Sequence, residues 1–175
     1  QMYLYDLASG NLKNRITSGV GPITNIVRID EKTRTMWYEA VGKEPGQDPY
    51  FTHLYKIGFD GKNNVSLTPD NGTHSTQISP DGKWIIDTFS QPDVAPETVL
   101  RDGATGALVM PLEKADISKL LATGWTPPMQ ITMKSADGKH DIYGLLFRPT
   151  NFDATKKYPI INQAYPGPQS GSVGS

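Results

Sequence analysis

The sequence predicts a mostly β protein: part of a β-propeller with four-stranded antiparallel blades, followed by the first strands of a second domain. One observation is a strand-turn-strand pattern that recurs through residues 1–112 and stops after Leu112. The other is a content of 17 glycines and 14 prolines in 175 residues, which suits a turn-rich β protein better than a helical one. The length allows one domain, or one domain and part of another.

The recurring pattern has a spacing typical of propeller blades. Leu4, Leu54 and Val99 lie at equivalent positions of three similar stretches, 50 and 45 residues apart. A second unit, two strands around a polar turn, occurs at residues 29–37 and again at 78–86. A repeat of about 40 to 50 residues with four strands predicts a β-propeller, in which each blade buries its faces against its neighbours.

The repeat divides residues 1–112 into parts of blades. We expect an outer hairpin from Met2 to Ile16, one whole blade from Ile23 to Leu67 and another from His74 to Met110. The turn Ser79-Pro80-Asp81-Gly82 supports this division, because proline fixes φ at about −65° and glycine tolerates a positive φ. Two and a half blades cannot close a ring, so their open faces would need further blades or another copy of the chain.

Two polar stretches are predicted to be loops at equivalent places of the two blades. Residues 42–50 are expected to be a solvated connector, with lining of the propeller rim or tunnel as the alternative. Residues 89–96 are expected to have a structural role.

Residues 113–128 are predicted to be a helical and proline-rich linker. Ile117, Leu120 and Leu121 would share one face of a helix that ends at Gly124. The Pro-Pro pair that follows disfavours helix in the residues before it. We therefore place a domain boundary here, with the second domain over residues 129–175.

The second domain is predicted to begin with a hairpin. Two β-prone runs, 130–135 and 141–148, flank Asp137-Gly138, which is among the strongest short hairpin signals. A polar loop over residues 149–157 would then lead to a third strand over residues 158–164.

The chain ends on a distinctive turn. Lys156-Lys157 and the β-prone run after them lead to Tyr165-Pro166-Gly167-Pro168, which would bring an aromatic hydroxyl to a sharp loop. This segment resembles the early strand and oxyanion turn of the prolyl oligopeptidase family of serine peptidases, in the form found in its dipeptidyl peptidase IV branch. The resemblance covers essentially the whole chain, and it implies that residues 129–175 begin an α/β-hydrolase domain.

The resemblance also implies a role for Tyr165, the one candidate catalytic residue. Its phenol would donate a hydrogen bond to the oxyanion, and such a neutral donor binds more strongly as negative charge develops. The alternative is that Tyr165 is a core aromatic residue.

The function implied is that of a serine exopeptidase, which releases N-terminal dipeptides with Pro or Ala at the second position through an acyl-enzyme. The sequence has no Gly-x-Ser-x-Gly nucleophile elbow. We therefore expect an interior fragment that lacks the nucleophilic Ser, the Asp and the His, and that is inactive alone. Two alternatives remain: a related oligopeptidase or acylaminoacyl peptidase, and a non-catalytic propeller that binds a partner.

Composition excludes several other classes. The 17 basic and 18 acidic residues give no sign of a nucleic-acid surface. The absence of cysteine excludes disulfides and thiol-based zinc sites, and no apolar run is long enough to cross a bilayer. We expect no cofactor and no metal, peptides as partners, and a homodimer as a possible state of the parent protein. A periplasmic or extracellular location is favoured over the cytoplasm.

The remaining candidate groups are expected to be structural. None of the histidines has a second ligand at metal spacing, so each is interpreted as structural or solvent-exposed. Four aspartates are interpreted as turn or edge carboxylates. The residues are His53, His74 and His140, and Asp30, Asp48, Asp81 and Asp141.

Overall fold

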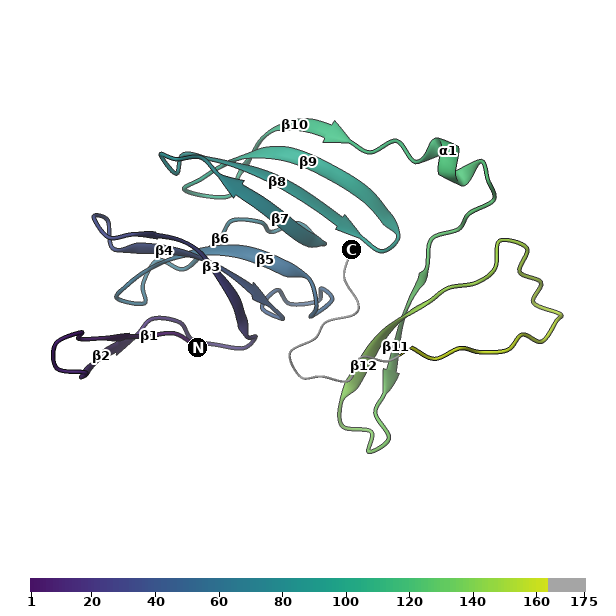
Figure 1. Cartoon of the computed structure of the whole chain (residues 1–175), viewed down its shortest axis with the longest axis horizontal. Coiled ribbons are helices and arrows are strands. Elements are labelled where there is room, and N and C mark those ends of the chain that lie inside the picture. Colours follow the sequence, from purple (N-terminus) through teal and green to yellow (C-terminus); the bar gives the residue numbers. More distant parts are fainter. Residues whose placement is uncertain (164–175) are drawn as a thin grey trace.

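The computed structural model describes residues 1–163, which form two four-stranded antiparallel sheets flanked by two hairpins (Figure 1). The first sheet has the strand order β3-β4-β5-β6, and the second has the order β10-β9-β8-β7. The strands of the first sheet are β3 (Ile23–Asp30), β4 (Thr35–Val41), β5 (Thr52–Gly58) and β6 (Val65–Ser66). The strands of the second sheet are β7 (Thr73–Ile78), β8 (Trp84–Gln91), β9 (Val94–Asp102) and β10 (Leu108–Lys114).

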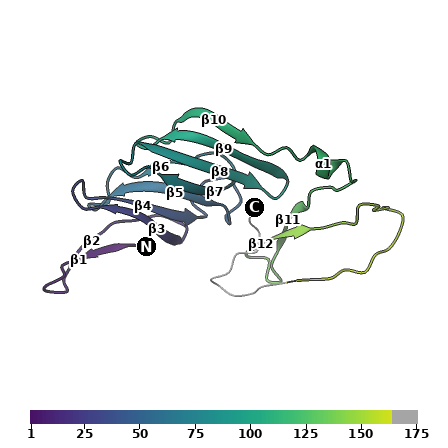
Figure 2. The same cartoon turned by 45° about the horizontal axis from the view of Figure 1, so that its top comes forward.

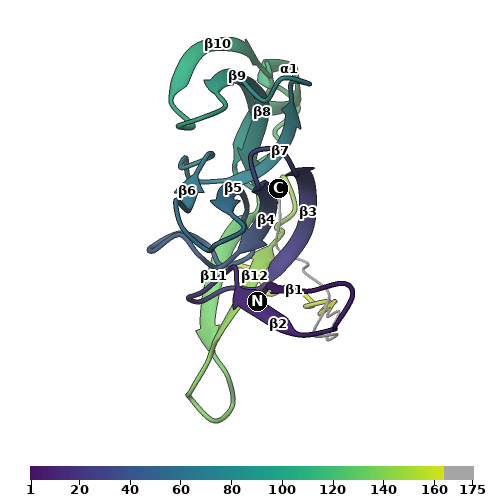
Figure 3. The ribbon, with the colours of Figure 1, turned by 90° about the vertical axis from the view of Figure 1, so that its left-hand side faces the viewer.

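One hairpin precedes the first sheet in the chain, and the other follows the second sheet. The N-terminal hairpin consists of β1 (Tyr3–Tyr5) and β2 (Leu12–Arg15). The other consists of β11 (Met129–Lys134) and β12 (Asp141–Leu146), and it follows one helical turn, α1 (Ser118–Leu121). Figure 3 shows the N-terminal hairpin, the first sheet and the second sheet one after another along the molecule.

The predicted hairpin and both predicted blades are confirmed as antiparallel sheets. Each four-stranded sheet is a simple meander in which neighbouring strands follow one another in the chain, as in propeller blades. Figure 2 shows the two sheets as stacked layers, each with the usual twist.

Two apolar clusters hold the layers together. One joins the N-terminal hairpin to the first sheet, with Tyr38 and Tyr55 stacked at 5.3 Å between ring centroids. The other joins the two sheets through Trp37, Leu54 and Ile85. Because side chains alternate along a strand, neighbours such as Trp37 and Tyr38 serve opposite faces of the same sheet.

One turn recurs at the strand ends. Asp6, Asp30 and Asp102 each accept, through one carboxylate oxygen, the main-chain N–H groups two and three residues further on. The residue four positions after each aspartate has a left-handed φ, +71° at Gly10, +52° at Arg34 and +76° at Gly106. Arg34 therefore stands where the other two turns have glycine, at a usual cost of about 1–2 kcal/mol.

The predicted boundaries need three corrections. Residues 113 and 114 belong to β10, because they pair with Thr98 and Glu97 of β9, so the linker begins later than predicted. The helix is a single turn without a buried residue. Residues 89–96 are not a loop, because β8 and β9 continue to a tight turn at Pro92-Asp93.

The predicted hairpin around Asp137-Gly138 is confirmed with a regular register from Met129–Leu146 to Lys134–Asp141. The predicted strand over residues 158–164 is wrong for residues 158–163, which have no regular structure. A strand needs a neighbour that satisfies its main-chain groups, and the part of the chain described here pairs nothing with this run. The start of an α/β-hydrolase sheet is therefore not seen.

One face of the second sheet carries apolar side chains that are partly exposed to solvent. Trp84, Ile86 and Met110 lie on this face and are 44%, 42% and 49% exposed. A propeller blade covers such a face with its neighbour.

The junction of the two sheets predicts a matched pair of glycine variants. A Cβ at Gly106 would lie 2.6 Å from Cα and 2.7 Å from the carbonyl oxygen of Leu67, whereas a Cβ at Gly10 would meet nothing within 4 Å. Gly10→Ala should therefore lower the free energy of unfolding by only about 1–2 kcal/mol, the usual penalty of a left-handed φ. Gly106→Ala should lower the free energy of unfolding by more than this, because the main-chain atoms of Leu67 must also move. Urea denaturation measures both variants, and equal losses would show that the sheets are not in contact here.

Candidate functional site

A cluster of charged and polar side chains is buried at the junction of the two sheets. Asp87 of β8, Arg101 of β9 and His74 of β7 all point toward the first sheet, and each is less than a tenth exposed. Asp70, in the connection between β6 and β7, closes the cluster from its more exposed side.

Arg101 is the centre of this cluster. Its Nε donates to Asp87 Oδ2 at 2.7 Å, and its two terminal nitrogens donate to the Gly106 carbonyl and to the Asp70 carboxylate. A guanidinium with fixed donors suits such a multiple contact, which a lysine could not reproduce. Arg101 thereby joins β8, the β9–β10 turn and the connection from the first sheet.

His74 faces hydrogen-bond acceptors on both sides of its ring. Its Nδ1 lies 2.9 Å and 3.0 Å from the two carboxylate oxygens of Asp87, and its Nε2 lies 3.0 Å from the Asp70 carbonyl oxygen. A carboxylate and a carbonyl only accept, so only an imidazolium donates to both.

His53 lies beside His74, with 4.9 Å between the ring centroids. Its Nδ1 lies 2.6 Å from the Thr68 carbonyl oxygen and must carry the proton of that hydrogen bond, while its buried Nε2 has no partner in the described part of the protein. Burial lowers the pKa of His53, and the neighbouring His74 acts in the same direction. The Thr68 carbonyl, Glu44 and Asp87 oppose this shift of the pKa.

The connection between β4 and β5 is only partly the solvated connector that was predicted. Glu44 accepts hydrogen bonds from the Tyr55 hydroxyl at 2.7 Å and from Ser66 Oγ at 3.0 Å. Burial, with Glu44 nearby, raises the pKa of Tyr55, so its phenol stays protonated and acts as a donor. The middle of the connection, around Gly46, is exposed.

The same connection faces the hairpin β11–β12. Tyr50 packs edge to face on Tyr143, with 5.9 Å between the centroids. Gln130 donates to Asp93 in the β8–β9 turn at 2.9 Å. A cavity of about 290 Å³ opens beside that turn, with Trp125 on its wall. This end of each sheet is therefore the one that contacts the hairpin β11–β12.

The candidate residues from the sequence fall into three groups. Tyr165 lies outside the described residues, so its environment is not seen.

The interpretation of the histidines is confirmed, since His53 and His74 are buried in a structural cluster and His140 is exposed. The interpretation of the four aspartates as turn and edge carboxylates is also confirmed. Asp30, Asp48 and Asp81 accept main-chain N–H groups of their own turns, and Asp141 pairs with Lys134 across the hairpin.

The sequence reasoning missed Asp87 and Arg101. The signal was present, because Asp87 alternates with Ile85 and Phe89, and Arg101 alternates with Val99, all on the face that points inward. A charged residue at an inward position of each of two neighbouring strands predicts a buried ion pair.

The cluster contains a His–Asp pair, as many hydrolases do, but it cannot perform their chemistry. The side chains of His74 and Asp87 are 1% and 0% exposed, so no substrate reaches them. Both nitrogens of His74 are also occupied, which leaves none to accept a proton from a nucleophile. The cluster is therefore structural.

Within residues 1–163, no three His, Asp or Glu side chains are grouped closely enough to hold a metal ion. No helix in this part of the chain is long and apolar enough to cross a membrane.

The geometry defines a class of protein: four-stranded antiparallel sheets consistent with propeller blades, one end of which contacts a further hairpin. Residues 1–96 match the family described as the dipeptidyl peptidase IV (DPP IV) N-terminal region. This match covers more than half of the chain, and the chain belongs to this family of serine peptidases.

The chain is also similar to individual members. It is 29% identical over 162 residues to a Schizosaccharomyces pombe protein named as a dipeptidyl aminopeptidase, covering 90% of this chain and 20% of that protein. It is 28% identical to the venom dipeptidyl peptidase 4 of Vespa velutina, covering 98% of this chain and 23% of that protein. The crystal structure of Porphyromonas gingivalis dipeptidyl peptidase 4 has the same fold, with a TM-score of 0.65 and 24% identity over 90% of this chain and 22% of that one. The chain thus spans about a fifth of the length of its relatives.

The buried cluster predicts a large effect of Arg101→Met. This substitution keeps much of the apolar stem but leaves Asp87 without its cation, and breaking a buried ion pair in this way usually costs about 3–5 kcal/mol. The control is Lys114→Met, which removes an ion pair to Glu97 whose lysine side chain is 69% exposed. Such surface pairs contribute about 0–1 kcal/mol. Similar losses in the free energy of unfolding, measured with urea, would contradict a central role of Arg101.

The lowered pKa of His53 predicts a pH dependence of stability. Below the ordinary histidine pKa of about 6.5 the unfolded chain binds a proton that the folded His53 does not, so stability falls as the pH falls from that value toward the folded pKa. His53→Asn keeps a donor toward Thr68 and cannot titrate. As the pH is lowered from 7.5 to 5.5, we expect the free energy of unfolding to decrease less in this variant than in the wild type. Identical slopes would assign the pH dependence to other groups.

Proposed function

We propose that this chain is part of a serine exopeptidase that releases N-terminal dipeptides with Pro or Ala at the second position through an acyl-enzyme. The single observation that carries this proposal is the family match over residues 1–96, together with similarity to dipeptidyl peptidases over nearly the whole chain. The triad that performs the chemistry would lie in the part of the longer protein beyond this chain.

In this proposal the two sheets would help to position the peptide substrate, and they would take no part in the chemical step. The side chains of Asp87 and Arg101 satisfy each other and are almost fully buried, so a substrate does not reach them. The end of the sheets that carries Tyr50 and Asp93 contacts the hairpin β11–β12. A rigid layer held against the start of the catalytic domain would fix the wall along which a peptide reaches the active site.

Tyr165 would supply the one catalytic group of this chain. The proposal rests on the Tyr-Pro-Gly-Pro turn, which resembles the oxyanion turn of the family. The hydroxyl would donate to the oxyanion of the tetrahedral intermediate and bind it more strongly than the ground-state carbonyl.

The test is Tyr165→Phe in the full-length protein, with hydrolysis of a Gly-Pro chromogenic substrate as the measurement. The variant keeps the ring and deletes the donor. We expect kcat to fall about 100-fold to 1,000-fold, with KM and the melting temperature nearly unchanged.

The matched control is Tyr158→Phe, seven residues earlier. The Tyr158 hydroxyl accepts a hydrogen bond from the Asp153 main-chain N–H on the exposed surface, so its loss should leave kcat unchanged. Normal turnover in Tyr165→Phe, or loss of activity through unfolding alone, would return Tyr165 to the role of a core aromatic residue. A full-length protein without any peptidase activity would instead favour the non-catalytic propeller.

A further inference from the structure

The connection between β6 and β7 contains the one asparagine of the sequence that is followed by glycine, in the pair Asn71-Gly72. Asn71 is exposed, whereas Gly72 is buried against β8, where an added Cβ would lie 2.8 Å from the Ser90 carbonyl oxygen. Asp70, the residue before this pair, belongs to the buried cluster. A change in the main chain at Asn71 would therefore act directly on that cluster.

An asparagine followed by glycine can react within its own main chain. The glycine nitrogen attacks the asparagine side-chain carbon Cγ, the new N–C bond closes a five-membered succinimide, and the bond from Cγ to the amide nitrogen breaks. The proton of the attacking nitrogen leaves with that amide group as ammonia. Water then opens the ring at one of its two carbonyl groups, which gives either aspartate or isoaspartate, whose main chain runs through Cγ. Glycine favours the attack because no side chain crowds its nitrogen, and the two groups are already held in one chain.

The hydrogen bonds of this connection leave both reacting groups free. Within residues 1–163, no hydrogen bond uses the Gly72 main-chain N–H or the Asn71 side-chain amide. The Asn71 main-chain carbonyl oxygen accepts from Gln91 Nε2 at 3.0 Å, but this oxygen takes no part in closing the ring. No hydrogen bond therefore has to break before the Gly72 nitrogen approaches Cγ.

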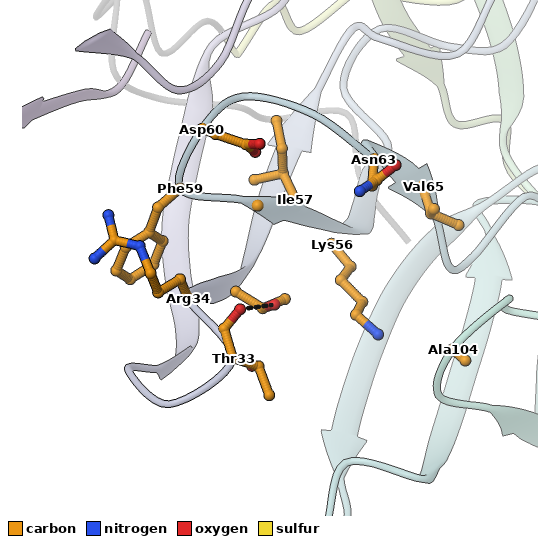
Figure 4. A pocket seen from close by; sticks show the side chains of 11 residues that line it. Thr33, Arg34, Lys56, Ile57, Phe59, Asp60, Asn63, Val65 and Ala104 are labelled. Atoms are coloured by element: carbon orange, nitrogen blue, oxygen red, sulfur yellow. Dashed lines mark hydrogen bonds between the residues drawn. The ribbon is translucent and has the colours of Figure 1, made fainter. Parts of the chain in front are cut away.

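Two asparagines of the β5–β6 connection provide an internal comparison. Asn63 lines a pocket of about 500 Å³ (Figure 4), and the residue after it is Asn64. Asn64 Oδ1 accepts from the Tyr38 hydroxyl at 2.9 Å, and the residue after it is Val65. In both cases a side chain on the next residue crowds the attacking nitrogen, most of all the branched valine. We therefore expect these two asparagines to stay intact where Asn71 reacts.

Isoaspartate in this connection would disturb the buried cluster, because it adds one methylene to the main chain between Asp70 and Gly72. Gly72 is packed against β8 and directly precedes β7, so it has little room to move. Asp70 binds Arg101 through its carboxylate, and its carbonyl oxygen lies 3.0 Å from His74 Nε2. The added length must therefore be accommodated on the Asp70 side, where it lengthens or breaks these two hydrogen bonds.

We propose that Asn71 is a site of spontaneous deamidation in the folded protein, and that the isoaspartate formed there weakens the contacts of Asp70 with Arg101 and His74. The reaction needs only the chain itself and water. This inference does not depend on the peptidase activity proposed above.

The experiment is incubation of the folded full-length protein at pH 8 and 37 °C, followed by peptide mapping with mass spectrometry. An isoaspartyl methyltransferase, used as a reagent, measures the isoaspartate. A synthetic peptide of residues 67–76 gives the rate without the fold. We expect Asn71 in the protein to react within about tenfold of the peptide rate, the factor that one hydrogen bond is worth, while Asn64 keeps its amide. An Asn71 that stays intact after the peptide has reacted completely, or that carries a glycan, would overturn the proposal.

Two variants test the effect on the buried cluster. Asn71→Gln keeps an amide but would have to close a larger ring, so its melting temperature should not change during the incubation, whereas that of the wild type should fall by a few degrees. Asn71→Asp, measured directly after purification, introduces the charge without lengthening the main chain and should melt close to the fresh wild type. If the incubated wild type kept its melting temperature, or if fresh Asn71→Asp were equally destabilised, the main-chain effect on Asp70 would be wrong.

Discussion

Asp87 and Arg101 form an ion pair with almost no access to solvent, and the inner face of the second sheet, with the connection that reaches it from the first, depends on this pair. Removing both charges from water costs several kcal/mol for each ion, which is recovered only when the remaining donors and acceptors are satisfied. Here Asp87 also accepts from His74, and Arg101 also reaches Asp70 and the Gly106 carbonyl. His74, Asp87 and Gly106 belong to the second sheet, whereas Asp70 lies in the connection from the first sheet, so the cluster fixes that connection against the second sheet.

The same junction explains why the β9–β10 turn must have a glycine. Gly106 brings its carbonyl to Arg101 and its Cα side against the main chain of Leu67, which is fully buried. Leu67 in turn belongs to the apolar cluster that includes Trp37, Leu54 and Ile85. Polar and apolar contacts therefore meet at one turn, and a shift of that turn would disturb both.

Much of the fold could be predicted from local signals. The repeat of Leu4, Leu54 and Val99 marked the sheets, and the Asp-Gly pair at 137–138 marked the second hairpin. The Asp87–Arg101 pair had a signal in the alternation of two neighbouring strands, but the contact of Arg101 with Asp70 had none, since Asp70 lies in an irregular connection 31 residues earlier. The strand expected over residues 158–164 depended on partners from elsewhere in a larger sheet, which a local pattern does not supply. Tyr165 could be identified only through its turn and the resemblance of that turn to a family.

The two ends of each meander sheet differ in the contacts that they make. At one end, the connections that carry Tyr50 and Asp93 contact the hairpin β11–β12, so this hairpin constrains their shape. At the other end, Asp-initiated turns stabilise themselves through their own N–H groups and need no neighbour to fold. Such a turn tolerates a change at its left-handed position when the new side chain compensates for the strain. Stacking on Phe59 offsets part of that strain at Arg34, but it leaves the guanidinium without a negative partner in the described structure. The distal turn of the first sheet can thus differ from its counterparts without disturbing the end that contacts the hairpin β11–β12.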